Sequence, residues 1–492
     1  MAAVGEPIAE RPEAPRKRQR HDDPVATAPL TALGEGDRPS LHVRLFGSHD
    51  FFRLWVAQVV SSLGDWLGFL AITVTAQRVG SVGVDGSGGA AIGLVMTARI
   101  VPGFFLAPVA GVLVDRLDRK KVMVTCDFAR AAVLCFLPFV DTVFGLVVAS
   151  LLLEVFTLLW SPAKEASVPN LVPPERLASA NSLSLAAAYG TLPVASVLFA
   201  LLAGAAKALG NIDALNSLRV NQEALAFYAD VITFVCSAIF ITTLKLGPTV
   251  RVARVDAEPR RAGFRETVRE FREGWSFIFV NPIVRAVNLG LATGLIGGGM
   301  VVPLGAVFAA QVLGAGASGY GFFVTAVGLG AASGIVLVSL LQSRLPKEGL
   351  FNLGVAGSGA FLIAAASFST LGPAAFCVAG LGVSAGTAYV LGFTLLHERV
   401  DDELRGRIFS ALYTLVRLCL LIAFAVGPFL SDLFDRLSLR LFGDRRAGLP
   451  GGGELFLPGV RLTLWLAGLI ILVAAGLVFL SIRGERREAA AA

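Results

Sequence analysis

Charged residues and histidines are scarce in this chain of 492 residues. Asp, Glu, Lys and Arg together form 16% of the sequence, and three of the four histidines lie within the first 50 positions. The fourth, His397, stands alone beside Glu398, so the His/Asp or Cys/His cluster expected of a membrane-embedded enzyme is missing. The sequence also has no Gly-x-x-x-x-Gly-Lys-Ser/Thr loop, which argues against ATP hydrolysis.

Cysteine is scarce as well, and its positions show no spacing typical of metal ligands. The five cysteines lie inside apolar runs, at Cys126, Cys135, Cys236, Cys377 and Cys419. We interpret them as small buried hydrophobic residues. The sequence therefore predicts no metal, no redox site and no cofactor.

Hydrophobic residues dominate the composition, at 55% with a mean hydropathy of +0.72. A water-exposed surface could not accommodate this composition without large apolar patches. The apolar runs exceed roughly 18 residues, which suits membrane helices, whereas barrel strands would be about 10 residues of alternating pattern. We therefore predict an all-α integral membrane protein and leave strands out of the account.

The runs predict twelve transmembrane helices. Their expected limits are 51–79, 90–114, 121–141, 143–163, 178–206, 224–244, 282–312, 319–342, 350–368, 373–396, 406–433 and 460–482. Most of the 42 Lys and Arg residues fall on one side if the N-terminus is placed inside. This bias predicts a multi-pass protein of the cell (inner or plasma) membrane with both termini cytoplasmic. The expected outer loop 434–459 is an exception, because it carries four arginines.

The two halves of the chain look like copies of one unit. With an offset of 228 residues, Gly93 and Thr97 fall on Gly321 and Thr325, and Arg116 falls on Arg344. A duplicated six-helix unit can form two bundles that rock about a midplane cavity. The expected organisation is a disordered cytoplasmic tail (1–48), a first bundle (49–245), a cytoplasmic linker with an interfacial helix (246–281), a second bundle (282–483) and a cytoplasmic tail (484–492).

The short loop Gly111 to Lys121 combines four cations with two acids in the pattern Gly-x-Leu-x-Asp-Arg-x-x-Arg-Lys. With its weaker copy at 339–347, it resembles the loop between helices 2 and 3 of the major facilitator superfamily. Asp118 stands where that signature usually has Gly. Further motifs make the chain most similar to the macrolide-efflux and enterobactin-exporter branch: Gly64-Asp65, Ala98-Arg99 to Pro102, Asp127 to Arg130, Pro162 to Leu183, Ala226 to Asp230 and Asp402 to Arg407. The resemblance implies twelve helices in two pseudo-symmetric six-helix bundles, the major facilitator fold.

The loop itself suggests a gate. Asp115 ends helix 2, where the positive end of helix 11, expected to begin near Gly406, could attract it. Gly111 opens the motif, and Arg116, Arg119 and Lys120 would hold the loop to lipid phosphates and nearby acids. The alternative reading of these cations is a pure topology anchor, which leaves the acid at Asp115 unexplained.

Charges within spans are costly, so each is expected to face a cavity or a partner. Asp65 in helix 1 and Arg99 in helix 2 are expected to pair, either as a proton-exchanging site or as a structural ion pair. Glu154 in helix 4 has no cation within one turn and is our preferred proton or cationic-substrate site. Its alternative is an acid hydrogen-bonded to neighbouring helices.

Three further positions complete the set of candidate residues. Asp127 and Arg130 are three residues apart on helix 3, which predicts an intrabundle pair with a structural or gating role. Asp230 in helix 6 and Arg417 in helix 11 are candidate substrate contacts.

These features together predict a secondary active transporter rather than an enzyme. We expect proton-coupled export of an amphipathic small molecule by a monomer in the lipid bilayer, with no nucleic-acid partner. Uptake or facilitated transport of a metabolite by the same fold is the alternative, and a membrane-embedded enzyme or scaffold is a remote one.

Overall fold

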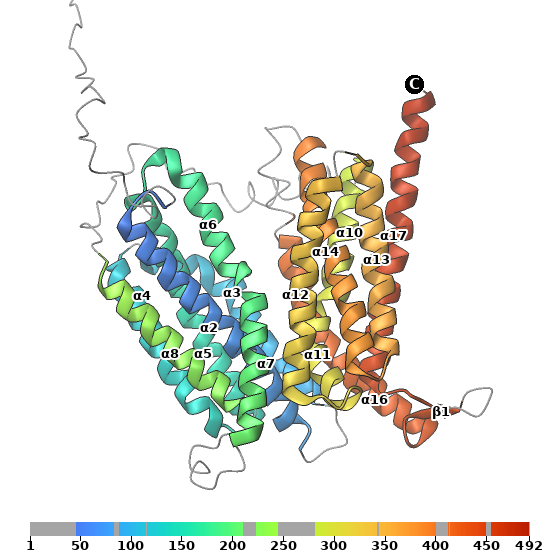
Figure 1. Cartoon of the computed structure of the whole chain (residues 1–492), viewed down its shortest axis with the longest axis horizontal. Coiled ribbons are helices and arrows are strands. Elements are labelled where there is room, and N and C mark those ends of the chain that lie inside the picture. Colours follow the sequence, from blue (N-terminus) through green and yellow to red (C-terminus); the bar gives the residue numbers. More distant parts are fainter. Residues whose placement is uncertain are drawn as a thin grey trace, which may run out of the picture.

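The computed structural model describes residues 46–82, 88–114, 116–209, 223–244, 281–341, 344–399, 412, 414–448 and 454–491. Within these ranges, twelve helices or helix pairs are long and apolar enough to cross a membrane. Figure 1 shows them as two bundles of steeply inclined helices, with the start of α2 and the end of α17 on the same side. We call this the termini side. The expected interfacial helix in 246–281 and nearly all of the tail 1–48 lie outside the described residues.

The first bundle is built from α2 to α8. Its elements are α2 (His49–Gly80), α3 (Gly89–Val114), α4 (Arg119–Phe136), η1 (Leu137–Phe139), α5 (Val143–Ser167), η2 (Val168–Asn170), η3 (Pro174–Arg176), α6 (Leu177–Gly190), α7 (Leu192–Leu209) and α8 (Ala224–Thr242). One predicted span, 178–206, is thus divided into α6 and α7 at Thr191, where Pro193 follows.

The second bundle is built from α10 to α17. Its elements are α10 (Pro282–Gly299), α11 (Val301–Gln311), α12 (Gly316–Leu341), α13 (Lys347–Ser367), α14 (Leu371–Arg399), η5 (Ile422–Val426), α16 (Gly427–Phe442), β1 (Arg446–Gly448), β2 (Glu454–Phe456) and α17 (Gly459–Ala491). The prediction that strands are absent is wrong for one antiparallel hairpin, β1 with β2.

Two further boundaries differ from the prediction. The eleventh span runs from Thr414 to Phe442 instead of ending at 433, and α17 continues to Ala491 through the expected tail 484–492. The arginines of the expected outer loop 434–459 therefore lie on α16 or in the hairpin. Arg445 is paired with Asp435 at 2.9 Å and Arg446 with Glu454 at 2.9 Å, so nearby acids balance both.

Short polar segments cap the ends of the helices. Ser48 accepts a hydrogen bond from the Phe51 N–H at 3.0 Å at the start of α2, and Thr142 does the same for Gly145 at the start of α5. The Asn281 side chain accepts from the N–H groups of Ile283 and Val284 at the start of α10. These side chains satisfy N–H groups that have no partner inside their own helix.

The two bundles contact each other on the side opposite the termini. In the first seam, α7 packs against α12, and the Thr325 hydroxyl lies 2.9 Å from that of Ser196. In the second seam, α3 packs against η5 and α16. Toward the termini side the ribbons of α6 and α12 diverge in Figure 1, and Leu185 and Tyr189 of α6 are exposed.

Glycines at repeat-related positions allow the close approach in both seams. A Cβ on Gly93 would lie 2.9 Å from the Ala425 carbonyl oxygen, and one on Gly321 would lie 2.7 Å from the Ala200 Cβ. Gly93 and Gly321 are the pair that the offset of 228 superposes. The sequence repeat therefore corresponds to equivalent places at the bundle interface.

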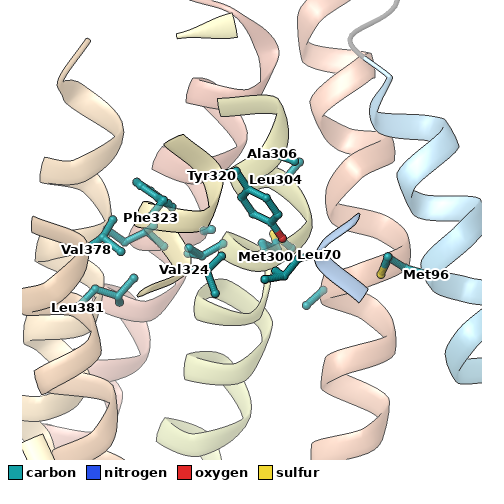
Figure 2. Packing of buried hydrophobic residues seen from close by; sticks show 14 of the residues in the cluster. Leu70, Met96, Met300, Leu304, Ala306, Tyr320, Phe323, Val324, Val378 and Leu381 are labelled. Carbon is teal, nitrogen blue, oxygen red and sulfur yellow. The ribbon is translucent and has the colours of Figure 1, made fainter. Parts of the chain in front are cut away.

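An apolar core continues across the interface. Figure 2 shows buried side chains running from Val378 and Leu381 of α14, through Phe323 of α12 and Met300, to Leu70 of α2. Dense apolar packing excludes water, so the side opposite the termini is closed.

Three of the spans at the interface are interrupted near their middle. The breaks are the α6–α7 junction at Thr191, the α10–α11 junction at Met300 and the π-helical turn η5. Before the first break, Trp66 Nε1 of α2 donates to the Ala188 carbonyl at 2.9 Å, which fastens α6 to its own bundle. Such breaks are common places for helices to bend.

Packing within the second bundle provides a first test of the fold. A Cβ on Gly334 would lie 2.2 Å from the Val383 carbonyl of α14, so Gly334→Ala must push two backbones apart. We expect a loss of about 1–3 kcal/mol of stability or more, measured as a lower melting temperature in detergent. Gly476→Ala on α17 is the matched control, because a Cβ there meets nothing within 4 Å. Equal melting temperatures for the two variants would contradict this packing.

Candidate functional site

Arg130 of α4 lies at the centre of a charged cluster inside the first bundle. Its guanidinium forms a close ion pair with Asp127 on the same helix, and its Nη1 lies 3.4 Å from Oδ1 of Asp65 on α2. The second carboxylate oxygen of Asp127 accepts a hydrogen bond of 2.8 Å from Ser237 on α8. One cation thus joins acids from two helices.

Aromatic rings enclose the same guanidinium. The Arg130 Cζ lies 4.2 Å from the ring centroid of Phe234 and 5.4 Å from that of Trp160, distances at which cation–π attraction is effective. Arg130 and Asp127 are 1% and 0% exposed. Removing either partner would leave a buried charge, so this ion pair stabilises the packed bundle.

Asp230 of α8 is the second buried acid of the cluster, at 1% exposed. The Thr233 hydroxyl lies 3.1 Å from its Oδ1, and no described cation lies within 4 Å of it. Its carboxylate packs against the α2 backbone, where a Cβ on Gly64 or Gly68 would come within 2.1 and 2.3 Å of its oxygens. These two glycines are the reason that a carboxylate can fit between α2 and α8.

A small cavity adjoins these groups. It is lined by Asp65, Gly68, Arg99, Leu134, Leu153, Asp230 and Phe234 and has a volume of about 10 Å³. A space of this size holds about one water molecule. A water there could exchange protons between Asp65, whose side chain is 34% exposed, and the buried Asp230.

Glu154 of α5 and Arg99 of α3 complete the cluster. Glu154 is half-buried, and its Oε1 would lie 3.9 Å from a Cβ on Gly103 of α3. Arg99 is close enough to interact electrostatically with Glu154, and its Cζ lies 5.6 Å from the Phe69 ring centroid. Among the described residues, Glu154 makes no hydrogen bond or ion pair, so the alternative of an acid tied to neighbouring helices finds no support.

The structure corrects one expected contact. We expected Asp65 to pair with Arg99, but its cation is Arg130 on α4, and no described carboxylate lies within 4 Å of Arg99. Arg99 and Asp65 nevertheless line the same cavity. The contact of Asp127 with Arg130 follows from their spacing of three residues on α4.

The expected gating loop is described except at Asp115, so its contact with helix 11 lies outside the described residues. Arg119 donates to the Ala166 carbonyl at 2.6 Å and Lys120 to the Leu244 carbonyl at 2.8 Å, which ties α4 to the ends of α5 and α8. Arg116 is exposed, and a Cβ on Gly111 would meet nothing within 4 Å.

Asp118, the departure from the usual signature, has a local explanation. Its side chain accepts hydrogen bonds from the N–H groups of Lys120 and Lys121 at 3.0 and 3.2 Å. It is therefore the N-cap of α4.

Arg417 is not part of the cluster. It is exposed and lies three residues after the start of the eleventh span at Thr414, on the second bundle. The sequence analysis missed two other polar residues that matter here, Ser237 and Thr233, because isolated hydroxyls in an apolar helix give no distinctive pattern. It also missed Arg461 of α17, which is 0% exposed and donates to the carbonyls of Phe456 and Phe368.

The cluster has more acids than cations. Its four carboxylates, Asp65, Asp127, Glu154 and Asp230, face two guanidiniums, Arg99 and Arg130. Arg130 is shared by Asp65 and Asp127, whereas Glu154 and Asp230 have no cation within 4 Å among the described residues. An unpaired carboxylate in a low-dielectric interior is stabilised by a proton or by a nearby cation.

Twelve membrane-length helices in two bundles, which contact each other on the side opposite the termini among the described residues, with ionisable groups buried inside the first bundle, are typical of a membrane transport protein. Residues 54–424 match the sequence model of the Major Facilitator Superfamily. The chain belongs to this family, and its function is transport rather than catalysis.

Individual relatives are similar at low identity. The chain is 25% identical to macrolide efflux protein A of Streptococcus pyogenes, over 79% of this chain and 90% of that protein. It is also 25% identical to the uncharacterized MFS-type transporter YfiS of Bacillus subtilis, over 77% and 86%.

Solved structures show the same fold. A bacterial homologue of the human lysosomal transporter Spinster aligns with a TM-score of 0.67 at 18% identity, over 88% of this chain and 97% of that one. The nucleoside transporter NupG aligns with a TM-score of 0.61 at 11% identity, over 88% and 99%.

The difference between the two arginines gives a testable prediction. Arg130→Gln leaves Asp127 as a buried unpaired charge, so we expect a loss of about 3–5 kcal/mol of stability. Arg99→Gln breaks no ion pair and should change stability far less. Thermal unfolding in detergent measures both, and the double variant Arg130→Gln/Asp127→Asn should recover part of the loss. A larger loss for Arg99→Gln than for Arg130→Gln would contradict the central role of Arg130.

Proposed function

We propose that this chain exports an amphipathic small molecule by alternating access, in exchange for protons. The observation that carries the proposal is the half-buried Glu154 carboxylate, which has no hydrogen-bonding or ion-pair partner among the described residues. A carboxylate in such a place can be neutralised either by a proton or by a cationic cargo, but not by both at once. Competition between the two ligands is the physical basis of exchange.

The surroundings of Glu154 suit a cargo with both polar and apolar parts. Arg99 and Asp65 supply charge nearby, while the partly exposed Phe69 of α2 supplies apolar surface. The similarity to a macrolide efflux protein is consistent with export of a molecule of this kind.

The proton gradient across the membrane can supply the energy for export. Each elementary charge that crosses the membrane releases about 2.3 kcal/mol per 100 mV, so inward proton movement can drive accumulation outside. The chain needs no nucleotide for this mechanism, and a single copy contains both bundles.

The proposed orientation places both termini in the cytoplasm. Arg116 and the first residues of α4, Arg119 to Lys121, form a short cationic segment. It lies on the termini side, because Lys120 donates to the Leu244 carbonyl, next to the Thr243 carbonyl that Arg53 near the start of α2 contacts. Short cationic segments between membrane helices stay cytoplasmic. With this orientation, the contact between the bundles is at the outer side.

A transport assay tests the coupling role of Glu154. Glu154→Gln keeps the shape of the side chain but cannot bind and release a proton, so we expect proton-driven efflux to fall at least tenfold. The assay compares cells carrying each variant, using a panel of dyes, macrolides and siderophores with and without a protonophore. Glu165→Gln is the matched control, because Glu165 is an exposed acid of the same helix.

Two outcomes of this assay would change the proposal. Unchanged efflux by Glu154→Gln would remove this residue as the coupling site. Accumulation inside the cell in place of efflux would reverse the direction to uptake.

The orientation has its own test. An epitope tag inserted between Gly448, which ends β1, and Glu454, which begins β2, should be reached by antibody on intact cells, while a reporter fused after α17 should be active only in the cytoplasm. A tag that becomes accessible only after permeabilisation would overturn the orientation.

A further inference from the structure

Asp432 of α16 hydrogen-bonds to the first bundle across the seam. Its Oδ1 accepts from the Gly89 N–H at 3.2 Å, and its Oδ2 accepts from the Ala90 N–H at 2.7 Å. Gly89 and Ala90 begin α3, so a single carboxylate of the second bundle caps a helix of the first. The residue is 8% exposed, which strengthens a charge-assisted contact to a helix N-terminus.

The backbone is shaped to let this contact form. A Cβ on Gly89 would lie 2.5 Å from the Pro428 carbonyl and 2.9 Å from Oδ1 of Asp432, so α3 can begin here only with glycine. One turn further along α3, a Cβ on Gly93 would lie 2.9 Å from the Ala425 carbonyl oxygen and 2.9 Å from the Phe429 ring. The two helices therefore approach backbone to backbone over the first turn of α3.

Asp435 makes a comparable contact three residues later, but within its own bundle. Its Oδ1 accepts from the Gly459 N–H at 3.0 Å, at the start of α17, and its Oδ2 is 2.9 Å from Arg445. The same chemistry thus occurs twice on α16. Asp435 fixes α16 to α17 permanently, whereas the contact of Asp432 must break if the two bundles separate at this side.

We propose that Asp432 is a positioning residue of the transport cycle, which holds the outer side closed through its hydrogen bonds to the N-terminus of α3. The inference rests on the alternating access proposed above and adds the residue that sets the balance between its two states. In the closed state the carboxylate and the two N–H groups satisfy each other. When the seam opens, water replaces both partners, so the contact favours closure without preventing opening.

The other seam shows why a charged contact is useful here. Between α7 and α12, closure relies on the neutral hydrogen bond of Thr325 with Ser196 and on the close packing of Gly321 against Ala200. Packing of small residues is short-ranged, whereas the attraction between a carboxylate and a helix N-terminus acts over a longer distance. Asp432 can therefore draw α3 and α16 together before the small residues pack.

Distance measurements between spin labels test this inference. One label replaces Val82, which follows α2 and is 76% exposed, and the other replaces Leu441 of α16, which is 66% exposed, in a background without the five native cysteines. The pair reports the opening of the outer side. In Asp432→Asn, which loses the charge, we expect the ratio of long to short distances to rise roughly five- to tenfold, in line with the strength of a partly buried charge at a helix end. We expect Asp432→Ser to raise the ratio of long to short distances as well.

Asp435→Asn is the matched control, because it removes the same charge from the same helix without crossing the seam. We expect its distance distribution to match that of the unsubstituted protein. Asp432→Glu keeps the charge and should stay closer to the unsubstituted distribution than Asp432→Asn does. Unchanged distances in both neutral Asp432 variants, or an equal shift in Asp435→Asn, would overturn the proposal.

The distances between the spin labels do not depend on the identity of the cargo or on proton coupling. A protein that opens on loss of Asp432 but exports nothing from the panel would support the role of Asp432 and contradict the proposed export. If the protein exports normally but both neutral Asp432 variants keep the closed distances, the proposed export would be supported and the proposed role of Asp432 would be contradicted.

Discussion

An ionised group within the hydrocarbon layer must have a partner, and this constraint organises the first bundle. Arg130 satisfies it by contacting Asp65 and Asp127 beneath the rings of Phe234 and Trp160. Because the pair is buried and hydrogen-bonded to Ser237, it fixes the positions of α2, α4 and α8 relative to one another. Glu154 and Asp230 lie in the same bundle with no cation within 4 Å among the described residues, and the proposed exchange of protons for cargo is assigned to this cluster for that reason.

The interior of the first bundle and the interface between the two bundles are built from different kinds of residue. Ionisable groups gather in the middle of the first bundle, whereas the seam uses glycine, alanine and short hydroxyl side chains that let helices approach closely and part again. Helix breaks at Thr191, at Met300 and in η5 lie where the contacting halves begin. The interrupted helices can therefore bend near the midplane while the charged frame around Arg130 stays intact.

Much of this architecture could be predicted from the sequence, because long apolar runs have no alternative to helices in a membrane. The pairing of Asp127 with Arg130 followed from helical spacing alone. The partner of Asp65 did not, since α3 is apolar on all sides and its sequence does not indicate which face is turned toward α2. The eleventh span was ended too early because Arg436 and Arg440 lower its hydropathy, although Leu433, Leu437 and Leu441 continue its exposed apolar face.

The helix α3 is the physical link between the cluster and the outer seam. It carries Arg99 beside Glu154, and its first residues, Gly89 and Ala90, bind Asp432. Gly89 and Arg99 are ten residues apart, which at 1.5 Å per residue is about 15 Å along the helix. A helix is stiff over that length, so in the proposed exchange a displacement of Arg99, as Glu154 changes between its charged, protonated and cargo-bound forms, would move the end that Asp432 holds. Both proposed sites would then bias the same two-state element, which is the physical requirement for coupling binding to gating.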